Sequence, residues 1–190
     1  MFARTERLLL RPGWREDAPA LAAAIGDEAI VRNLATAPWP YNQADAEDFL
    51  ARTEDSTLPN FLIFSRTLGA PRLVGSCGIM QGKEDHLELG YWIARSYWGL
   101  GFATEAGKAV VRIARAMNLP RLQARHFLDN PASANVLRKI GFRPTNRVVL
   151  GYSRGRGQAA PCALFEEGDV VEMRPNLSLN LYKDDCALAA

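Results

Sequence analysis

Gly99 and Gly101, with one residue between them, mark the stretch of this chain best suited to bind a ligand. They lie between a predicted strand that ends near Ala94 and a predicted helix that begins near Phe102. Glycine lets backbone approach a ligand closely, and the first turn of a helix presents unpaired N–H groups at the positive end of its dipole. A strand, a glycine turn and a helix N-terminus together suit a pyrophosphate. The sequence therefore predicts a site for a phosphate-bearing cofactor.

The residues that follow these glycines do not fit one common phosphate-binding motif and fit a second one in part. A P-loop needs Lys followed by Ser or Thr after its last glycine, but this chain has Phe102 and Ala103, so that motif is excluded. The dinucleotide-binding fingerprint fits in part, because Thr104 stands at the third glycine and Arg121 occupies the region where an acid is expected. A nicotinamide-dependent oxidoreductase is therefore one alternative, and a tight turn without a ligand is another.

The elements around this turn predict one mixed α/β domain. Strands are expected over residues 7–11, 61–67, 73–80, 87–94, 122–128, 147–152 and 170–173. Helices are expected over residues 14–25, 45–53, 102–117 and 131–140, of which 102–117 has the most regular apolar spacing. The basic loop 153–158 lies between the last two strands and is expected to be solvated.

The composition is that of one compact globular domain, since the 190 residues are 48% hydrophobic and 23% charged. We assign residues 1–175 to this domain and 176–190 to a C-terminal tail. The net charge of +2 gives no general reason to expect nucleic acid or an anionic membrane as a partner. The apolar run 8–10 ends at Arg11 and Pro12, too short for a signal peptide or a membrane span, which favours a cytoplasmic location.

Metal and thiol chemistry find little support in the sequence. The three cysteines are far apart, they form no Cys-x-x-Cys pair, and the chain has two histidines, so no zinc site is expected. Cys77 lies inside a predicted strand and is expected to be a small buried residue and not a nucleophile.

Several motifs in order along the chain accompany the glycine turn. They are Thr5 to Arg11, Glu88 to Ile93, Thr104 to Ala106 and Asn130 to Phe142, on either side of the hexapeptide Trp98-Gly99-Leu100-Gly101-Phe102-Ala103. Together they resemble the GNAT superfamily of acyl-CoA-dependent N-acyltransferases, over residues 5–175 of this chain. Trp98 stands where the superfamily usually has Arg or Gln, which is typical of the branch that acetylates the amino termini of ribosomal proteins.

The resemblance implies a GNAT-like sheet that is twisted, mixed and mostly antiparallel, flanked by helices, with its fourth and fifth strands splayed apart. It implies acetyl-CoA as the acyl-donor cosubstrate, with the pantetheine arm in the gap and paired to backbone near Trp92, Ile93 and Ala94. The pyrophosphate is then expected on the amides of Trp98, Gly99, Leu100, Gly101, Phe102, Ala103 and Thr104. Asn130 and Asn135 are expected to contact the cofactor too. An ordinary helix N-cap for Asn130 and a solvent-facing position for Asn135 stay open as alternatives.

Amide formation needs a neutral amine, an oxyanion stabiliser, an acceptor for the amine proton and departure of the thiolate. Backbone N–H groups of the fourth strand are expected to stabilise the oxyanion. Many superfamily members have a Tyr general acid where this chain has Leu137, but a thiol with a pKa of about 8.5 can leave as thiolate. The resembled branch implies that Ser133 donates a hydrogen bond to the departing sulfur. Glu88 is our candidate base, with a salt-bridged strand carboxylate as the equal alternative.

These residues predict an N-acetyltransferase that moves an acetyl group from acetyl-CoA to a primary amine by direct attack in a ternary complex. The alternative is a catalytically silent acyl-CoA-binding or regulatory module, which the same turn would serve. The acceptor is expected to be a small-molecule amine or a protein N-terminus, whose pKa of about 7.7 to 8.0 leaves it partly neutral at physiological pH. Trp39 and Tyr41 are candidates for lining the acceptor site. A monomer or homodimer without nucleic-acid or membrane partners is expected.

Overall fold

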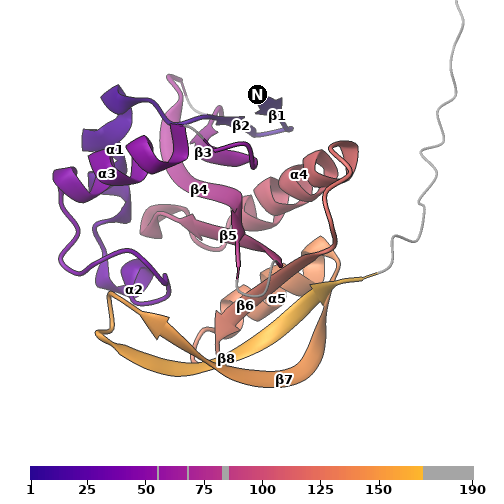
Figure 1. The fold of residues 1–190 in the computed structure, drawn as a ribbon. Helices are drawn as coiled ribbons and strands as arrows, with labels where there is room; N and C mark the ends of the chain where they lie inside the picture. The colour runs from indigo at the N-terminus through magenta and orange to yellow at the C-terminus, as the bar shows by residue number, and fades with distance from the viewer. Residues whose placement is uncertain (55, 68, 83–85, 169–190) are drawn as a thin grey trace, which may run out of the picture.

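In the computed structural model, which describes residues 1–54, 56–67, 69–82 and 86–168, the chain folds around an eight-stranded open sheet (Figure 1). The strand order is β1-β2-β3-β4-β5-β6-β8-β7. Neighbouring strands pair antiparallel except β5 and β6, which run parallel, so the predicted mixed and mostly antiparallel sheet is confirmed. The strands are Ala3–Arg4 (β1), Leu8–Arg11 (β2), Asn60–Ser65 (β3), Arg72–Gln81 (β4), Leu87–Ile93 (β5), Leu122–Phe127 (β6), Phe142–Ser153 (β7) and Gln158–Glu167 (β8).

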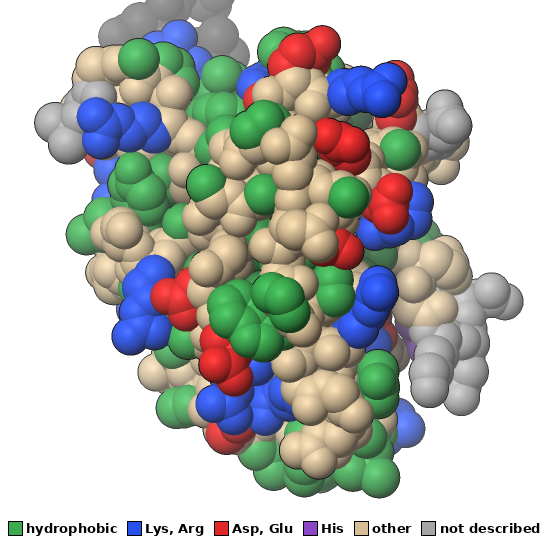
Figure 2. Space-filling model, turned by 90° about the vertical axis from the view of Figure 1, so that its left-hand side faces the viewer, with side chains coloured by type: hydrophobic (Ala, Val, Ile, Leu, Met, Phe, Trp, Pro, Cys, Tyr) green, Lys and Arg blue, Asp and Glu red, His purple; other side chains and the backbone are tan. Residues whose placement is uncertain are grey.

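Helices cover both faces of the sheet (Figure 1). One face carries α1 (Ala18–Ile25), α2 (Glu28–Val31) and α3 (Gln43–Glu54), and the other carries α4 (Phe102–Ala116) and α5 (Pro131–Ile140), with short 3₁₀ turns at Arg15–Asp17 (η1) and Arg95–Tyr97 (η2). Figure 2 views the side of the molecule that carries α1–α3 and shows acidic and basic side chains interspersed over it. Within the described part of the chain, none of these helices combines the length and the apolar character needed to span a bilayer.

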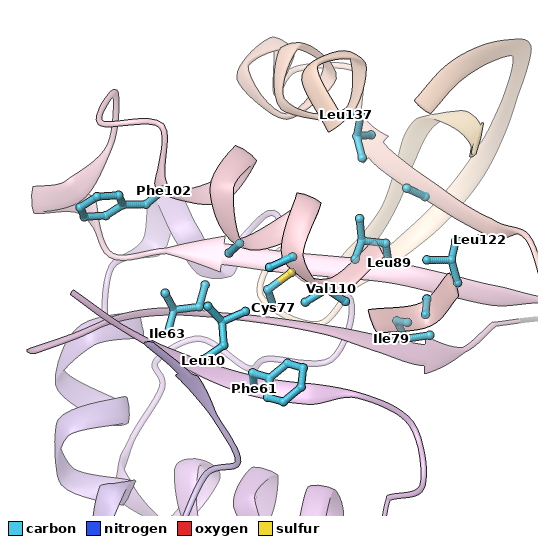
Figure 3. Packing of buried hydrophobic residues seen from close by; sticks show 14 of the residues in the cluster. Leu10, Phe61, Ile63, Cys77, Ile79, Leu89, Phe102, Val110, Leu122 and Leu137 are labelled. Carbon is cyan, nitrogen blue, oxygen red and sulfur yellow. The ribbon is translucent and has the colours of Figure 1, made fainter. Parts of the chain in front are cut away.

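The apolar side chains form one large cluster between the sheet and α4 and α5, and two smaller clusters beneath α1–α3. In the large cluster, side chains of β2–β5 meet the apolar face of α4, where Val110 lies beside Cys77 (Figure 3). That face exists because apolar residues recur along α4 at helical spacing, which confirms the prediction for this helix. Burial raises the pKa of the Cys77 thiol to about 12, so it stays a neutral core residue.

β5 and β6 separate soon after they begin. Their parallel pairing consists of two residue pairs, Leu87 with Leu122 and Glu88 with Gln123, although both strands continue for several residues. The rest of β5 pairs with β4 along one edge, and along the other edge, which faces the gap, no strand of the described part of the chain pairs with it. These are the fourth and fifth strands of the resemblance, and their splaying is confirmed.

The C-terminal part of the sheet differs from the sequence prediction. β7 begins earlier than residue 147, and β8 occupies a segment for which the sequence predicts a loop. Pro161 and the alanines around it hide the alternation of β8, which is fixed instead by pairing with β6 on one side and β7 on the other. The strand predicted at 170–173 and the tail 176–190 lie outside the described residues.

The tip of the β7–β8 hairpin is anchored at Arg156, so the prediction of a solvated loop at 153–158 is wrong for Arg156, while Arg154 and Gln158 are exposed. Arg156 pairs with Asp129 at 2.8 Å, donates to the Arg32 carbonyl at 2.6 Å and lies 4.3 Å from the centre of the Phe127 ring. These contacts place the tip beside α2 (Figure 1). α2 is itself absent from the prediction, because four residues capped by Asp27 are too short to show a helical period.

Replacing Phe165 with alanine tests whether β8 belongs to the core. Phe165 is 1% exposed, and loss of a buried Phe side chain lowers the free energy of unfolding by about 3–5 kcal/mol. Leu150→Ala on β7 is the control, because Leu150 is 73% exposed and its loss should change stability by less than about 0.5 kcal/mol. Urea unfolding followed by circular dichroism measures both variants, and equal effects would contradict this placement of β8.

Candidate functional site

The glycine turn adopts a backbone conformation that glycine permits. Gly99 and Gly101 have φ values of +78° and +81°, in the left-handed region. A Cβ atom built on Gly99 meets no neighbouring heavy atom within 4 Å, so conformation and not crowding selects glycine there. The turn leads from η2 into α4, with Gly101 as the N-cap residue.

Backbone donors converge at the start of α4. The amide of Glu105 donates to the Gly101 carbonyl at 3.0 Å, and the amides before it have no partner inside the helix. Gly101 has no side chain that caps them. The residues predicted to hold a pyrophosphate, Trp98 to Thr104, therefore form one continuous turn and helix end.

Trp98 ties this turn to β5. Its indole N–H donates to the Ile93 carbonyl at 2.6 Å, and the Arg95 guanidinium lies 5.1 Å from the centre of its ring. The side chain is otherwise open to solvent, with 47% exposed. At the position where Arg or Gln is usual, this chain thus uses a side chain that fixes the turn by packing and one hydrogen bond.

Residues from the N-terminal segment brace the turn from outside. The Glu105 carboxylate accepts hydrogen bonds from the Thr5 hydroxyl at 2.6 Å, the Arg7 amide at 2.9 Å and the Arg7 guanidinium at 2.8 Å. Arg7 also donates to the Leu100 carbonyl at 2.9 Å. Although burial opposes ionisation, these donors hold the pKa of Glu105 below its ordinary value of 4.5. Thr5, Arg7 and Glu105 are called the N-terminal clamp below.

The open edge of β5 offers backbone donors to the gap. The Ala94 N–H donates to the Val74 carbonyl on β4 at 2.8 Å, and the direction of N–H groups alternates along a strand. The N–H groups of Tyr91 and Ile93 therefore face the gap, whereas the Ala94 amide is engaged by β4. Of the predicted segment Trp92, Ile93 and Ala94, it is Ile93 whose N–H is directed toward a ligand in the gap.

The N-terminus of α5 lies across the gap from β5. The Asn130 side chain accepts a hydrogen bond from the Ser133 amide at 3.3 Å, so the N-cap role of Asn130 is confirmed. The Ser133 hydroxyl lies 2.8 Å from the Tyr91 hydroxyl, which also donates to the Ser133 carbonyl at 3.2 Å. Tyr91 thus joins the two sides of the gap. The sequence pattern marks it simply as a strand residue, so this contact is missed by the prediction.

Two other positions of α5 have partners of their own. Leu137 is 1% exposed and belongs to the large core cluster, so packing fills the place of the usual tyrosine. Asn135 accepts a hydrogen bond from Arg138 at 3.2 Å and lines a surface groove with His126 and Phe165, on the side of the helix near β6 and β8. A contact between Asn135 and a cofactor stays a prediction.

Glu88 lies at the apex of the gap, in the last residue pair of β5 and β6. Leu87 and Leu89 belong to the large core cluster, so alternation directs Glu88 to the opposite face of the sheet, where α1–α3 lie. There the Arg125 Nε lies 3.2 Å from a Glu88 carboxylate oxygen, and the Glu88 side chain is 14% exposed. A salt-bridged strand carboxylate is therefore present, and Glu88 and Ser133 lie on opposite faces of the sheet.

The two aromatic candidates for the acceptor site differ in environment. Trp39 is 42% exposed, whereas Tyr41 packs against Trp92, and burial raises the pKa of Tyr41 to about 12. Since Trp92 and Glu88 are separated by an even number of strand positions, they share one face of β5. Tyr41 therefore lies on the same face of the sheet as Glu88.

These features fit an extended thioester cosubstrate that carries phosphate at one end. Unpaired helix amides behind two left-handed glycines suit the phosphate, and the open edge of β5 suits an arm that contains amide groups. The hydroxyls of Tyr91 and Ser133 lie beside the same gap.

Comparison with known proteins agrees with this geometry. Residues 7–143 match the family model of the acetyltransferase (GNAT) domain, which is well over half of the chain. The chain therefore belongs to the GNAT acetyltransferase family. It is an enzyme that uses acetyl-CoA, the source of an activated acetyl group, for N-acetyl transfer.

Individual relatives span nearly the whole domain. The uncharacterized N-acetyltransferase p20 of Bacillus licheniformis is 26% identical over 168 residues, which cover 85% of this chain and 92% of the relative. A GNAT-family acetyltransferase structure from Bacillus anthracis superimposes with a TM-score of 0.73 at 22% identity, covering 87% of this chain and 97% of that one. The structure of RimL, a ribosomal L7/L12 alpha-N-protein acetyltransferase in complex with coenzyme A, gives a TM-score of 0.71 at 18% identity, with coverages of 88% and 97%.

Glu105→Gln weakens the N-terminal clamp, and the effect should depend on pH. At neutral pH the free energy of unfolding is expected to fall by about 2 kcal/mol, because hydrogen bonds to a charged group are lost. The folded-state pKa lies below the ordinary value, so the ionised carboxylate stabilises the wild type above pH 4.5, and this advantage disappears as the pH falls further. Urea unfolding of both proteins across this range measures the difference.

The control for this prediction is Glu47→Gln on the exposed surface of α3, where the carboxylate accepts a hydrogen bond from Gln43. It should change stability little at any pH. A stability difference for Glu105→Gln that stays constant through the acid range would show that the charge of Glu105 is not what holds the clamp together.

Proposed function

We propose that the chain acetylates a primary amine by direct attack on acetyl-CoA in a ternary complex. The observation that carries this proposal is the separation of β5 and β6 beyond Glu88, which opens the sheet between its two faces. Acetyl-CoA then lies on the side of α4 and α5, and the acceptor approaches from the side of α1–α3. The two substrates meet at the gap.

The cofactor side combines the glycine turn, β5 and the start of α5. The amides of Trp98, Gly99, Leu100, Gly101, Phe102, Ala103 and Thr104 hold the pyrophosphate. The segment Trp92, Ile93 and Ala94 holds the pantetheine arm, chiefly through the Ile93 N–H, while Asn130 and Asn135 contact it from α5. The bound cosubstrate supplies a thioester carbonyl and a thiol leaving group with a pKa of about 8.5.

Two side chains handle the proton and the leaving group from opposite faces. Glu88 accepts the amine proton, directly or through a water, on the α1–α3 face, and the ion pair with Arg125 holds its carboxylate in place. Ser133 donates a hydrogen bond to the departing sulfur on the α4–α5 face. Backbone N–H groups of β5 that face the gap stabilise the developing oxyanion.

The acceptor is a protein N-terminus or a small-molecule amine. The enzyme works in the cytoplasm as a monomer or homodimer. An α-amino group is partly neutral at physiological pH. A lysine amine has a pKa of about 10.4, and lowering that pKa to physiological pH costs about 4 kcal/mol, which is much to ask of a site with one carboxylate. RimL, whose described substrate is a protein amino terminus, shares the fold and supports this choice. The interspersed surface charges in Figure 2 favour neither nucleic acid nor an anionic membrane as a partner.

Gly99→Ala tests the phosphate site with a matched control at Gly69. Both glycines have a positive φ, +78° and +72°, and both have open space where a Cβ would lie, so each variant should lose about 1 kcal/mol of stability. Only Gly99→Ala should weaken coenzyme A binding, by about tenfold, because relaxation of the turn moves the amides. Calorimetric titration measures both, and equal affinities in the two variants would contradict the site.

Turnover separates the enzyme from a silent acyl-CoA-binding module. The purified chain should release free thiol from acetyl-CoA with amines, and mass spectrometry should find the acetyl group on the amine. Glu88→Gln should lower kcat about 100-fold at neutral pH, and less at high pH where the amine is already neutral. The control is Glu166→Gln, an exposed carboxylate on β8.

The outcomes of this experiment are distinct. Tight coenzyme A binding without thiol release across peptides and small amines would favour the silent module. Full activity of Glu88→Gln would instead leave Glu88 as a structural partner of Arg125, with water as the base.

A further inference from the structure

The Tyr91 hydroxyl is a buried polar group that the proposed reaction leaves without a role. Tyr91 lies on the open part of β5, and its side chain packs against the large core cluster on the α4–α5 face. Its hydroxyl lies 2.8 Å from the Ser133 hydroxyl and 3.2 Å from the Ser133 carbonyl oxygen, and either oxygen can accept its proton. One side chain thus reaches from the open strand to the first turn of α5, beside the proposed position of the thioester.

The hydroxyls of Tyr91 and Ser133 face each other, so the direction in which one donates limits the direction in which the other can donate. Each hydroxyl has one proton to donate and lone pairs to accept. The Tyr91 proton can point to the Ser133 hydroxyl at 2.8 Å or to the Ser133 carbonyl at 3.2 Å, and the hydroxyl is the shorter contact. When it points to the hydroxyl, the Ser133 proton is free to be donated elsewhere, and the gap is where a ligand would accept it. Burial raises the pKa of Tyr91, although the hydrogen bond with Ser133 acts in the other direction, so Tyr91 stays a neutral donor at physiological pH.

We infer that Tyr91 is a positioning residue that orients the Ser133 hydroxyl so that its proton points to the departing sulfur. This inference rests on the proposed role of Ser133 in acetyl transfer. As the new C–N bond forms and the C–S bond breaks, the electron pair of the C–S bond stays on sulfur and the amine proton goes to Glu88 or water. Ser133 stabilises the resulting negative charge by a hydrogen bond and keeps its proton, which Tyr91 holds in the productive direction.

Tyr91 is not the source of a proton in this scheme. Transfer from Ser133 to sulfur would have to be balanced by transfer from Tyr91 to Ser133, which would leave a tyrosinate among apolar side chains. A thiol of pKa about 8.5 does not need to be protonated as it leaves. The pair therefore replaces a general acid by a fixed hydrogen-bond donor, in a helix where Leu137 is committed to the core.

The first test needs no acceptor amine. When coenzyme A binds to the wild type, the pKa of the coenzyme A thiol should fall below its value in the free cofactor. The ultraviolet absorbance of the thiolate measures this pKa, with the complex of desulfo-coenzyme A as the blank. Tyr91→Phe should raise the pKa of the bound thiol by about 1, which corresponds to loss of about one hydrogen bond. Ser133→Ala should raise it at least as much, and Tyr91→Phe should add nothing in the Ser133→Ala background. Tyr152→Phe, at a tyrosine of β7 that is 59% exposed, is the control.

Kinetics give the second readout of the same double-mutant cycle. Tyr91→Phe should lower kcat about tenfold with the KM for acetyl-CoA unchanged. Phenylalanine keeps the buried ring, and thermal unfolding shows whether the variant is folded. If Tyr91→Phe does not fold, Ser133→Thr replaces it, because threonine keeps a hydroxyl within reach of Tyr91. The thiol of coenzyme A bound to Ser133→Thr is expected to keep its low pKa, and an ordinary thiol pKa in that variant would overturn the inference.

The outcomes separate this inference from the proposed function. If the wild type does not bind coenzyme A, the proposed function fails and the inference fails with it. If the wild type binds it and lowers the thiol pKa while Tyr91→Phe matches the wild type, the inference alone is wrong. An effect of Tyr91→Phe that persists undiminished without the Ser133 hydroxyl assigns Tyr91 a packing role and also overturns the inference.

Discussion

The early end of pairing between β5 and β6 is the constraint on which the rest of the site depends. A strand in the middle of a sheet normally satisfies its backbone groups on both edges, and unpaired buried groups are costly. Beyond Glu88, however, β5 pairs with a described strand on one edge alone, where Ala94 donates to Val74. The opposite edge is left with N–H groups that a ligand with amide groups can satisfy, which is why we propose this edge as the binding surface for an extended arm.

The glycine turn and the N-terminal clamp complete this arrangement at one end of the gap. Left-handed backbone at Gly99 and Gly101 aims the first amides of α4 outward, but a turn with so little side-chain packing needs support from elsewhere. Arg7 provides it by contacting Glu105 at the start of the helix and Leu100 in the turn. The bend between β1 and β2 thereby holds in place a turn that lies almost one hundred residues later in the sequence.

The sequence predicts the parts of the molecule that depend on local patterns. The spacing of apolar residues predicts α4, and the glycines before it predict the turn. The cap residue Asn130 predicts the start of α5, because helical periods and caps are local patterns. The contacts of Tyr91 with Ser133, of Arg7 with Glu105 and of Arg156 with α2 join residues far apart in the chain, and no local pattern reveals them. β8 is missed for a related reason, since pairing with two neighbours stabilises a segment whose own composition favours a loop.

The proposed reaction divides its side chains between the two faces of the sheet. Ser133 and Tyr91 lie on the face of α4 and α5, where we propose that the cofactor binds, and Glu88 and Arg125 lie on the face of α1–α3, where we propose that the acceptor approaches. Arg156 at the hairpin tip pairs with Asp129 and donates to the Arg32 carbonyl, and Asp129 directly precedes Asn130 at the start of α5. The hairpin tip, α2 and the start of α5 are therefore connected directly as well as through the sheet. Successive side chains of β5 lie on opposite faces of the sheet. A shift of its register would therefore move both Glu88, the proposed base, and Tyr91, which contacts the proposed leaving-group donor Ser133.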